Sequence, residues 1–328
     1  MRIVNTYPLP ADAVARLAVL PGVALSSADA DLHDVDRSAI EVLFGELPDD
    51  GPASMPHLRW LARAGAGIED LDLSGLAARG IVLTNASGLH ASAMGEYCLG
   101  ALLFASQHQA VRLARQAAHE WDSAAAFAEP LRGRTLGVIG YGSIGREVAR
   151  LAAAFGMRVL AIKAQPGDRR DPGFRPAGTG DPDGTIPERI DGPSGLLGVL
   201  AESDYIVLSM PLTRATHGLI DRDALAACRP TAWLVNVGRG PMIVEAALIE
   251  ALRSGRLAGA YLDVFDEEPL PVDHPYWDTP NLFISPHIAG VNSYDVYWQQ
   301  LGELLVENLR RLLADEPMLN QIDLARAY

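Results

Sequence analysis

The chain has 328 residues, of which 49% are hydrophobic and 21% charged, and its formal net charge is -14. This length predicts about two domains with separate cores, and the composition excludes a disordered or fibrous chain. The negative charge argues against nucleic acid and anionic membranes as partners, although a small anion can still bind where arginines or helix N-termini gather.

Only two cysteines are present, Cys98 and Cys228, without a Cys-x-x-Cys pair or a histidine cluster beside them. Neither a disulfide framework nor a metal site is therefore predicted. The first residues lack the apolar core of a signal peptide, and the richest apolar stretch, 99–105, is far shorter than the roughly 20 residues of a membrane span. We expect a cytoplasmic protein.

Two series of short apolar runs predict two parallel sheets. The first series predicts strands at 2–6, 23–26, 41–45, 58–64 and 81–85, and the second at 134–140, 158–163, 205–210, 232–237, 259–264 and 282–285. Continuous hydrophobic strands are typical of parallel sheets covered by helices on both faces. A long buried helix is predicted from Ala93 to about Glu120, and a last helix, from Ser293 to about Ala314, returns to the first domain or caps the second.

Residues 166–195 form a biased segment, in which 18 of 30 positions are Gly, Pro or Asp. This composition predicts a long surface loop, because neither a helix nor a strand can run through most of it. The loop is either an unimportant insertion or a segment that covers a ligand.

A glycine-rich turn, Gly140-Tyr141-Gly142-Ser143-Ile144-Gly145, lies between a predicted strand and a predicted helix. In such a turn the first glycine permits the tight bend, the second lets the backbone approach a pyrophosphate, and the third lets the helix pack against the strand. The phosphates would meet N–H groups at the positive end of the helix. The motif predicts a dinucleotide site; the alternative is an ordinary tight turn.

The next strand ends at Lys163, where NAD-specific proteins place an acidic residue that binds the adenosine ribose. Arg169 and Arg170 follow. These cations favour the 2'-phosphate of NADP(H). The alternative is that Lys163 is solvated and that Gln165 or Asp168 reaches the ribose.

Three polar residues follow later strands: Arg239, Glu268 and His287. Ligands bind at the carboxyl edge of open α/β sheets, so these side chains are expected to converge. Reduction of a 2-keto acid needs a cation for the carboxylate and an acid that protonates the developing alkoxide. Arg239 suits the first role and His287 the second, and Glu268 would favour the charged imidazole. Taken singly, each residue has a surface or ion-pair interpretation.

These motifs, together with the stretches 64–72, 85–97 and 203–213, resemble the D-isomer-specific 2-hydroxyacid dehydrogenase family nearly end to end. The resemblance implies an α/β fold with two doubly wound parallel-sheet domains, in which a Rossmann dinucleotide-binding domain at 104–291 is inserted into a flavodoxin-like substrate domain at 1–103 plus 292–328. It also implies a homodimer.

The resemblance assigns roles to individual residues. Arg239 and the backbone of Ala66 and Gly67 would bind the substrate, with His287 as acid/base and Glu268 as its partner. Beyond the glycine loop and Lys163, the residues that it places on the cofactor are Met94, Met210, Pro211, Val237, Gly238, Asp263 and Gly290.

The sequence thus predicts an oxidoreductase that transfers a hydride between NAD(P)(H), with NADP(H) favoured, and a small D-2-hydroxyacid or 2-keto acid. Glyoxylate or hydroxypyruvate is the first expectation, because nothing near 64–68 indicates a large aromatic or phosphate pocket. Two alternatives remain. One is a dinucleotide-sensing binding protein like the corepressors of this fold, and the other is a family member that acts on an unusual acid.

Overall fold

The computed structural model describes residues 1–68, 70–121, 127–291 and 294–325. The chain divides into two compact units. The first comprises Met1–Leu89, Pro172–Pro176 and Asn292–Tyr328, and the second His90–Asp171 and Ala177–Val291. None of the helices in the described part of the chain combines the length and the apolarity that a bilayer crossing requires.

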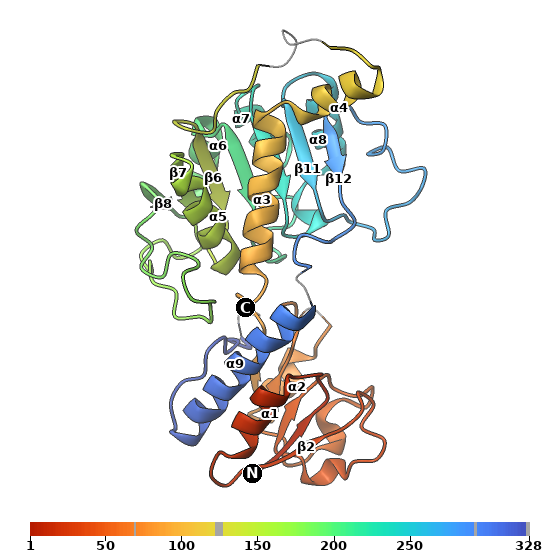
Figure 1. Ribbon diagram of the computed structural model, residues 1–328, viewed down its shortest axis with the longest axis vertical. Coiled ribbons are helices and arrows are strands. Elements are labelled where there is room, and N and C mark those ends of the chain that lie inside the picture. The colour runs from red at the N-terminus through yellow and green to blue at the C-terminus, as the bar shows by residue number, and fades with distance from the viewer. Residues whose placement is uncertain (69, 122–126, 292–293, 326–328) are drawn as a thin grey trace. The chain divides into compact units, whose positions relative to one another are not determined.

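The first unit, which holds α1, α2, β2 and α9 in Figure 1, contains a five-stranded parallel sheet in the order β2-β1-β3-β4-β5. Its strands are β1 (Arg2–Asn5), β2 (Ala24–Ser27), β3 (Val42–Phe44), β4 (Trp60–Ala62) and β5 (Val82–Thr84). This is the flavodoxin-like order, and each strand lies where the sequence predicts one. The helices of the unit are α1 (Ala11–Ala18), α2 (Leu73–Ala78) and α9 (Tyr294–Leu313).

Alternate residues of these strands face two separate cores. Ile3 packs in one core with Leu17 of α1 and Leu301 of α9, and the adjacent Val4 packs in the other with Leu76 of α2. Helices therefore cover both faces of the sheet, which explains the continuous hydrophobic character of the inner strands β3 and β4. Helix α9 belongs to this unit, so the prediction that the last helix returns to the first domain is confirmed over the other alternative.

The second unit contains a seven-stranded parallel sheet in the order β12-β11-β10-β9-β6-β7-β8. Its strands are β6 (Thr135–Ile139), β7 (Arg158–Ile162), β8 (Arg189–Asp191), β9 (Tyr205–Leu208), β10 (Trp233–Asn236), β11 (Gly259–Leu262) and β12 (Leu282–Ile284). The order is that of a Rossmann fold with one added strand. The chain runs outward from β6 to β8 and then returns to β9 on the other side of β6, so the topological switch point lies between β6 and β9.

Helices cover both faces of this sheet as well. Figure 1 shows α3 (Ala91–Ser106) and α5 (Ser143–Ala154) on one face, where their side chains share a core with Val138 and Val207. On the opposite face, α6 (Leu196–Glu202), α7 (Arg222–Ala227) and α8 (Glu245–Arg253) pack against Ile206 and Leu234. The fold is thus α/β with two parallel sheets.

Two local predictions need correction. The long helix expected from Ala93 to about Glu120 is broken at His108, whose φ of 49° is left-handed. The second piece, α4 (Gln109–Ala117), has no buried residue, so that part of the prediction was wrong. Because α3 ends only at Ser106, the domain boundary expected after residue 103 falls inside a helix.

The segment 166–195 is less uniformly a surface loop than its composition suggests. It contains the edge strand β8, the buried Asp181, and Pro172–Pro176, which groups with the first unit. Within that unit the Phe174 amide donates a hydrogen bond to Asn320 Oδ1 at 2.9 Å. The strand β8 is Arg-Ile-Asp, whose single apolar residue forms no hydrophobic run, and buried contacts made by a Gly- and Pro-rich segment leave no periodic signal either.

Candidate active site

The glycine-rich turn joins β6 to α5 at the switch point. Gly140 has a φ of 109°, and a Cβ there would lie 2.8 Å from the Met210 amide nitrogen. A Cβ on Gly145 would lie 2.2 Å from the Gly140 carbonyl oxygen. At Gly142, by contrast, a Cβ would meet nothing within 4 Å. The outer glycines are therefore needed for packing, and the middle one leaves the backbone open to a ligand.

Helix α5 begins at Ser143, and no side chain caps it at Gly142. The amide groups of its first turn have no acceptors within the helix, and the helix dipole makes this end positive. An open backbone at Gly142 beside such a terminus fits a pyrophosphate, so the residues present suit a dinucleotide.

Tyr141 lies in the glycine turn with its side chain buried. Its hydroxyl donates to Asp181 Oδ2 at 2.6 Å, and the Arg146 guanidinium carbon lies 4.6 Å from the ring centre. Burial and the adjacent Asp181 carboxylate raise the pKa of Tyr141, so the phenol stays protonated. The Tyr141 hydroxyl is therefore not available to a ligand, and the Tyr141 amide donates to the Ile162 carbonyl at 3.1 Å. The bond to Tyr141 also ties the loop residue Asp181 to the turn.

Lys163 is the first residue after β7, and its amide donates to the Asp191 carbonyl at 2.9 Å. Its Nζ donates to the Asp168 carbonyl and lies 3.9 Å from Asp168 Oδ2. Partial burial lowers the pKa of Lys163, and the Asp168 carboxylate partly offsets this effect. Of the other cations in this region, Arg170 is largely exposed, whereas Arg169 donates to the Gly184 carbonyl at 3.1 Å.

His287 and Glu268 meet directly at the carboxyl edge of the sheet. His287 Nδ1 lies 2.7 Å from Glu268 Oε2, and Glu268 Oε1 accepts from the Phe265 amide at 2.9 Å. The His287 side chain is 52% exposed. Because Nδ1 faces the carboxylate, Nε2 is the ring nitrogen that can face a substrate.

The environment of Glu268 favours its ionised form. Partial burial acts to raise the pKa of Glu268, but the hydrogen bonds from His287 and Phe265 act in the opposite direction. The positive charge of Arg239 adds to them, and the net effect is a lowered pKa. A carboxylate held in this way can orient and stabilise an imidazolium.

Arg239 follows β10 in a loop shaped by Asn236. The Asn236 amide group donates to the Arg239 carbonyl at 3.0 Å and accepts from the Gly238 amide, also at 3.0 Å. The guanidinium donates to the Gly238 carbonyl at 2.8 Å. Asn236 was not predicted as a site residue, although its place at the strand end before Arg239 was a usable signal.

The other residues predicted on the cofactor lie at the same edge of the sheet or on α3. Met210 and Pro211 follow β9, Val237 and Gly238 follow β10, Asp263 follows β11, Gly290 lies beyond β12, and Met94 lies in the first turn of α3. Gly238 is packed so closely that a Cβ would lie 2.9 Å from the Met210 carbonyl oxygen. Asp263 is buried and holds the segment that carries His287.

Ala66 and Gly67 lie in the first unit, in the loop after β4. The Asn85 side chain donates to the Ala66 carbonyl at 2.7 Å, and Arg63 donates to the Gly67 carbonyl at 3.3 Å. The Gly65 carbonyl accepts from the Ala86 amide at 3.1 Å. Within the described part of the chain, the amides of residues 65, 66 and 67 donate no hydrogen bond to a protein acceptor. With its carbonyls engaged, the loop presents N–H groups, which suits a carboxylate.

Two tyrosines hold the start of this loop. The Tyr7 hydroxyl accepts from the Ala64 amide at 2.8 Å, and the Tyr297 hydroxyl donates to the Ala64 carbonyl. Neither tyrosine was predicted as a site residue from the sequence, because the two come from opposite ends of the chain and carry no local motif.

A family model for the NAD binding domain of D-isomer specific 2-hydroxyacid dehydrogenases matches residues 99–289. Among curated proteins, the chain is 33% identical over 261 residues to an (S)-sulfolactate dehydrogenase from Chromohalobacter salexigens, covering 80% of this chain and 79% of that protein. It is also 33% identical over 258 residues to a glyoxylate reductase from Korarchaeum cryptofilum, covering 77% and 73%. A D-3-phosphoglycerate dehydrogenase from Mycobacterium leprae is 35% identical over 266 residues, covering 80% of this chain but only 47% of that longer protein.

Solved structures are similar to this chain over its whole length. A D-isomer specific 2-hydroxyacid dehydrogenase from Xanthobacter autotrophicus Py2, in complex with NADPH and MES, has a TM-score of 0.79 at 28% identity and covers 100% of both chains. An NADPH-dependent glyoxylate/hydroxypyruvate reductase from Sinorhizobium meliloti, in complex with NADP and sulfate, has a TM-score of 0.73 at 26% identity and covers 100% of this chain and 99% of that one. The chain belongs to the D-isomer specific 2-hydroxyacid dehydrogenase family, with an NAD(P)-binding domain inserted between the parts of its other domain.

Proposed function

We propose that the protein reduces a small 2-keto acid to the D-2-hydroxyacid with NADPH, and that glyoxylate or hydroxypyruvate is its substrate. The observation that carries the proposal is the 2.7 Å contact between His287 Nδ1 and Glu268 Oε2 at the carboxyl edge of a dinucleotide-binding sheet. A histidine paired in this way is suited to acid/base catalysis near neutral pH.

In this proposal Arg239 binds the carboxylate and the keto oxygen, and the amides of Ala66 and Gly67 help to bind the carboxylate. The bound nicotinamide supplies a hydride to the carbonyl carbon. His287 gives its Nε2 proton to the carbonyl oxygen as the C–O double bond becomes a single bond, and Glu268 stabilises the imidazolium until that proton leaves. Neutral His287 then regains a proton from water, which closes the cycle.

The cofactor would be held by the glycine turn and by the strand ends around it. Gly140, Gly142 and Gly145 shape the pyrophosphate site, with the backbone of Tyr141, Ser143 and Ile144 beside it. Asp263 Oδ2 accepts a hydrogen bond from the Ala289 amide at 2.8 Å, and a carboxylate oxygen can accept a second from a nicotinamide carboxamide. Met94, Met210, Pro211, Val237, Gly238 and Gly290 would complete the contacts.

The preference for NADPH rests on Lys163 at the end of β7. Its positive charge suits the 2'-phosphate, which the carboxylate found at this position in NAD-specific proteins would repel. The presence of NADPH or NADP in the two similar structures supports this cofactor preference. The substrate is supported by the relatives named as glyoxylate reductases. The sulfolactate dehydrogenase favours a second candidate, a keto acid that carries a sulfonate.

The test measures oxidation of NADPH and NADH in parallel with glyoxylate, hydroxypyruvate, pyruvate and sulfopyruvate. Turnover of glyoxylate or hydroxypyruvate with NADPH would support the proposal, and turnover of sulfopyruvate alone would select the second candidate. A protein that binds NADPH but turns over none of these acids would contradict the proposal and favour a dinucleotide-sensing role.

The His287→Asn variant tests the mechanism. Asparagine tolerates the left-handed backbone at this position but cannot donate the proton, so turnover should fall by about 10²- to 10⁴-fold while the Kd for NADPH stays nearly unchanged. The exposed His33, replaced by Asn, is the control. Unchanged turnover in His287→Asn would remove His287 from the reaction.

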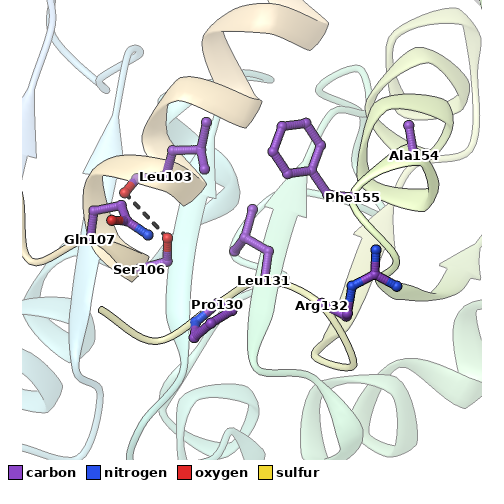
Figure 2. A pocket seen from close by; sticks show the side chains of 8 residues that line it. All are labelled: Leu103, Ser106, Gln107, Pro130, Leu131, Arg132, Ala154 and Phe155. Atoms are coloured by element: carbon purple, nitrogen blue, oxygen red, sulfur yellow. Dashed lines mark hydrogen bonds between the residues drawn. The ribbon is translucent and has the colours of Figure 1, made fainter. Parts of the chain in front are cut away.

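We also propose that the protein is a homodimer. Four apolar side chains on and after α4 are exposed, namely Val111 at 39%, Leu113 at 56%, Trp121 at 100% and Phe127 at 77%. Figure 2 shows a nearby pocket of about 370 Å³ between α3, α5 and the segment 130–132, lined by Leu103, Ser106, Gln107, Pro130, Leu131, Arg132, Ala154 and Phe155. Large exposed apolar patches are typical of an interface.

Sedimentation tests the homodimer. The parent chain should sediment as a dimer and the Leu113→Asp variant as a monomer, whereas Val19→Asp, on another exposed apolar residue in the first unit, should leave the dimer intact. A monomeric parent chain would overturn this part of the proposal.

A further inference from the structure

Asp263 accepts hydrogen bonds from the segment on both sides of His287. Its Oδ1 accepts from Ser285 Oγ at 2.6 Å and from the Ile288 amide at 2.9 Å, and its Oδ2 accepts from the Ala289 amide at 2.8 Å. The Asp263 carbonyl accepts from the His287 amide at 2.9 Å. The Asp263 side chain is buried, and hydrogen bonds to a buried carboxylate are among the strong ones.

These bonds matter because the backbone of His287 is strained. Its φ of 55° lies in the left-handed region, which a residue with a side chain adopts only where the surrounding structure holds it. Asp263 fixes this backbone through Ser285, two residues before His287, and through Ile288 and Ala289, directly after it. The backbone conformation in turn sets the direction of the imidazole toward Glu268.

Ser285 connects this carboxylate to α3. Its Oγ lies within hydrogen-bond distance of Asp263 Oδ1 and of the Tyr97 hydroxyl. A serine hydroxyl has one proton, and an ionised carboxylate can only accept. Ser285 therefore donates to Asp263 and accepts from Tyr97, so the chain of donors runs from Tyr97 through Ser285 to Asp263.

Tyr97 is suited to be the first donor. It lies on α3, and its ring packs edge-on against Tyr261 of β11, with the ring centres 5.7 Å apart. Burial raises the pKa of Tyr97; the bond to Ser285 acts to lower it, and the charge of Asp263 acts to raise it. The phenol thus keeps its proton throughout the range in which the protein works, and the packing leaves its hydroxyl a fixed direction.

We infer that Ser285 and Tyr97 are positioning residues for His287, which they orient through the Asp263 carboxylate. Neither needs to touch substrate or cofactor. Without the Ser285 hydroxyl, Oδ1 loses one of its two donors and can draw the Ile288 amide out of place. Without the Tyr97 hydroxyl, Ser285 is left with an unsatisfied acceptor and can turn away from Asp263. The inference rests on the proposed acid/base role of His287.

Ser285→Ala and Tyr97→Phe should each lower kcat by about 10- to 100-fold, since a small misplacement of a catalytic group is costly. The KM for the keto acid and the Kd for NADPH should stay within about 2-fold, because Asp263 Oδ2, the oxygen proposed for the cofactor, keeps its bond from the Ala289 amide, and Arg239 is unchanged. With NADPH deuterated at the C4 hydrogen that is transferred, the isotope effect on kcat should rise as the chemical step becomes limiting.

The double variant separates a shared chain from two independent packing defects. If both residues act through Asp263, Ser285→Ala combined with Tyr97→Phe should lose little more kcat than either alone, whereas independent losses would multiply. Two matched controls remove similar buried hydroxyls elsewhere in the unit, Ser203→Ala and Tyr205→Phe, and should keep the parent kcat.

Two outcomes overturn the inference, and a separate one contradicts the proposed function. Parent-like kcat in both Ser285→Ala and Tyr97→Phe overturns it, as does a loss that appears equally in KM, Kd and the controls. If Ser285→Ala does not fold, Tyr97→Phe and its isotope effect decide alone, because that change removes a single atom. Unchanged turnover in the His287→Asn variant would instead contradict the proposed function, so the two failures are distinguishable.

Discussion

Gly240 packs directly against the backbone of Phe265, and a Cβ on Gly240 would lie 2.0 Å from the Phe265 carbonyl carbon and 2.3 Å from its oxygen. Gly240 follows Arg239, and the Phe265 amide holds Glu268. The close approach therefore connects the loop of the arginine to the loop of the glutamate.

We expect Gly240→Ala to separate these two loops. The added Cβ cannot be accommodated without a backbone shift, so turnover should fall by about 10²-fold and the free energy of unfolding by about 1 to 3 kcal/mol. Steady-state kinetics and urea unfolding measure the two effects. Gly198→Ala, at a helical glycine whose Cβ would meet nothing within 4 Å, should keep full activity. Unchanged kinetics in Gly240→Ala would show that the loops do not depend on their contact.

Glu268 makes stability depend on acid pH. Its pKa is lowered from 4.5 in the folded protein, so its contribution to stability is complete above about pH 4.5 and is lost as the pH falls through the folded-state pKa. The difference in unfolding free energy between the parent and Glu268→Gln should shrink between neutral pH and about pH 3. Urea unfolding at several pH values measures it. A difference in unfolding free energy that stays constant with pH would mean that Glu268 is not ionised in its contact with His287.

Lys163→Asp tests the cofactor preference. A carboxylate at the end of β7 would repel a 2'-phosphate and accept from ribose hydroxyls, so the ratio of kcat/KM for NADPH to that for NADH should fall by at least about 10-fold, or roughly 1.4 kcal/mol. Arg253→Asp, an equal charge reversal at the exposed end of α8, is the control. An unchanged ratio would indicate that Gln165 or Asp168, and not Lys163, contacts the adenosine ribose.

Tyr7→Phe tests the carboxylate loop of the first unit. Burial, together with the nearby Glu46, raises the pKa of Tyr7, so its hydroxyl is protonated while it accepts from the Ala64 amide. Removing the hydroxyl should loosen the loop and raise the KM for the keto acid by about 3- to 10-fold, with the Kd for NADPH unchanged. Steady-state kinetics and cofactor titration measure this split. Equal weakening of acid and cofactor would indicate a general loss of structure.

The sequence determined the architecture because each signal was local. Eleven of the twelve strands in the described part of the chain lie where short apolar runs predict them, and the glycine turn is recognisable by its spacing between a strand and a helix. Arg239, Glu268 and His287 were identifiable for the same reason, since each follows a strand whose carboxyl end must reach the ligand edge of a parallel sheet.

Only the tertiary structure decided which groups hold those residues in place. The donor chain from Tyr97 to Asp263 joins positions more than a hundred residues apart, and Tyr7 and Tyr297 come from opposite ends of the chain to the backbone of one residue, Ala64. The break at His108 and the short strand β8 likewise leave no periodic pattern. Hydrophobic periodicity reports which face of an element is buried, whereas a hydrogen bond between distant side chains depends on the packed positions of both.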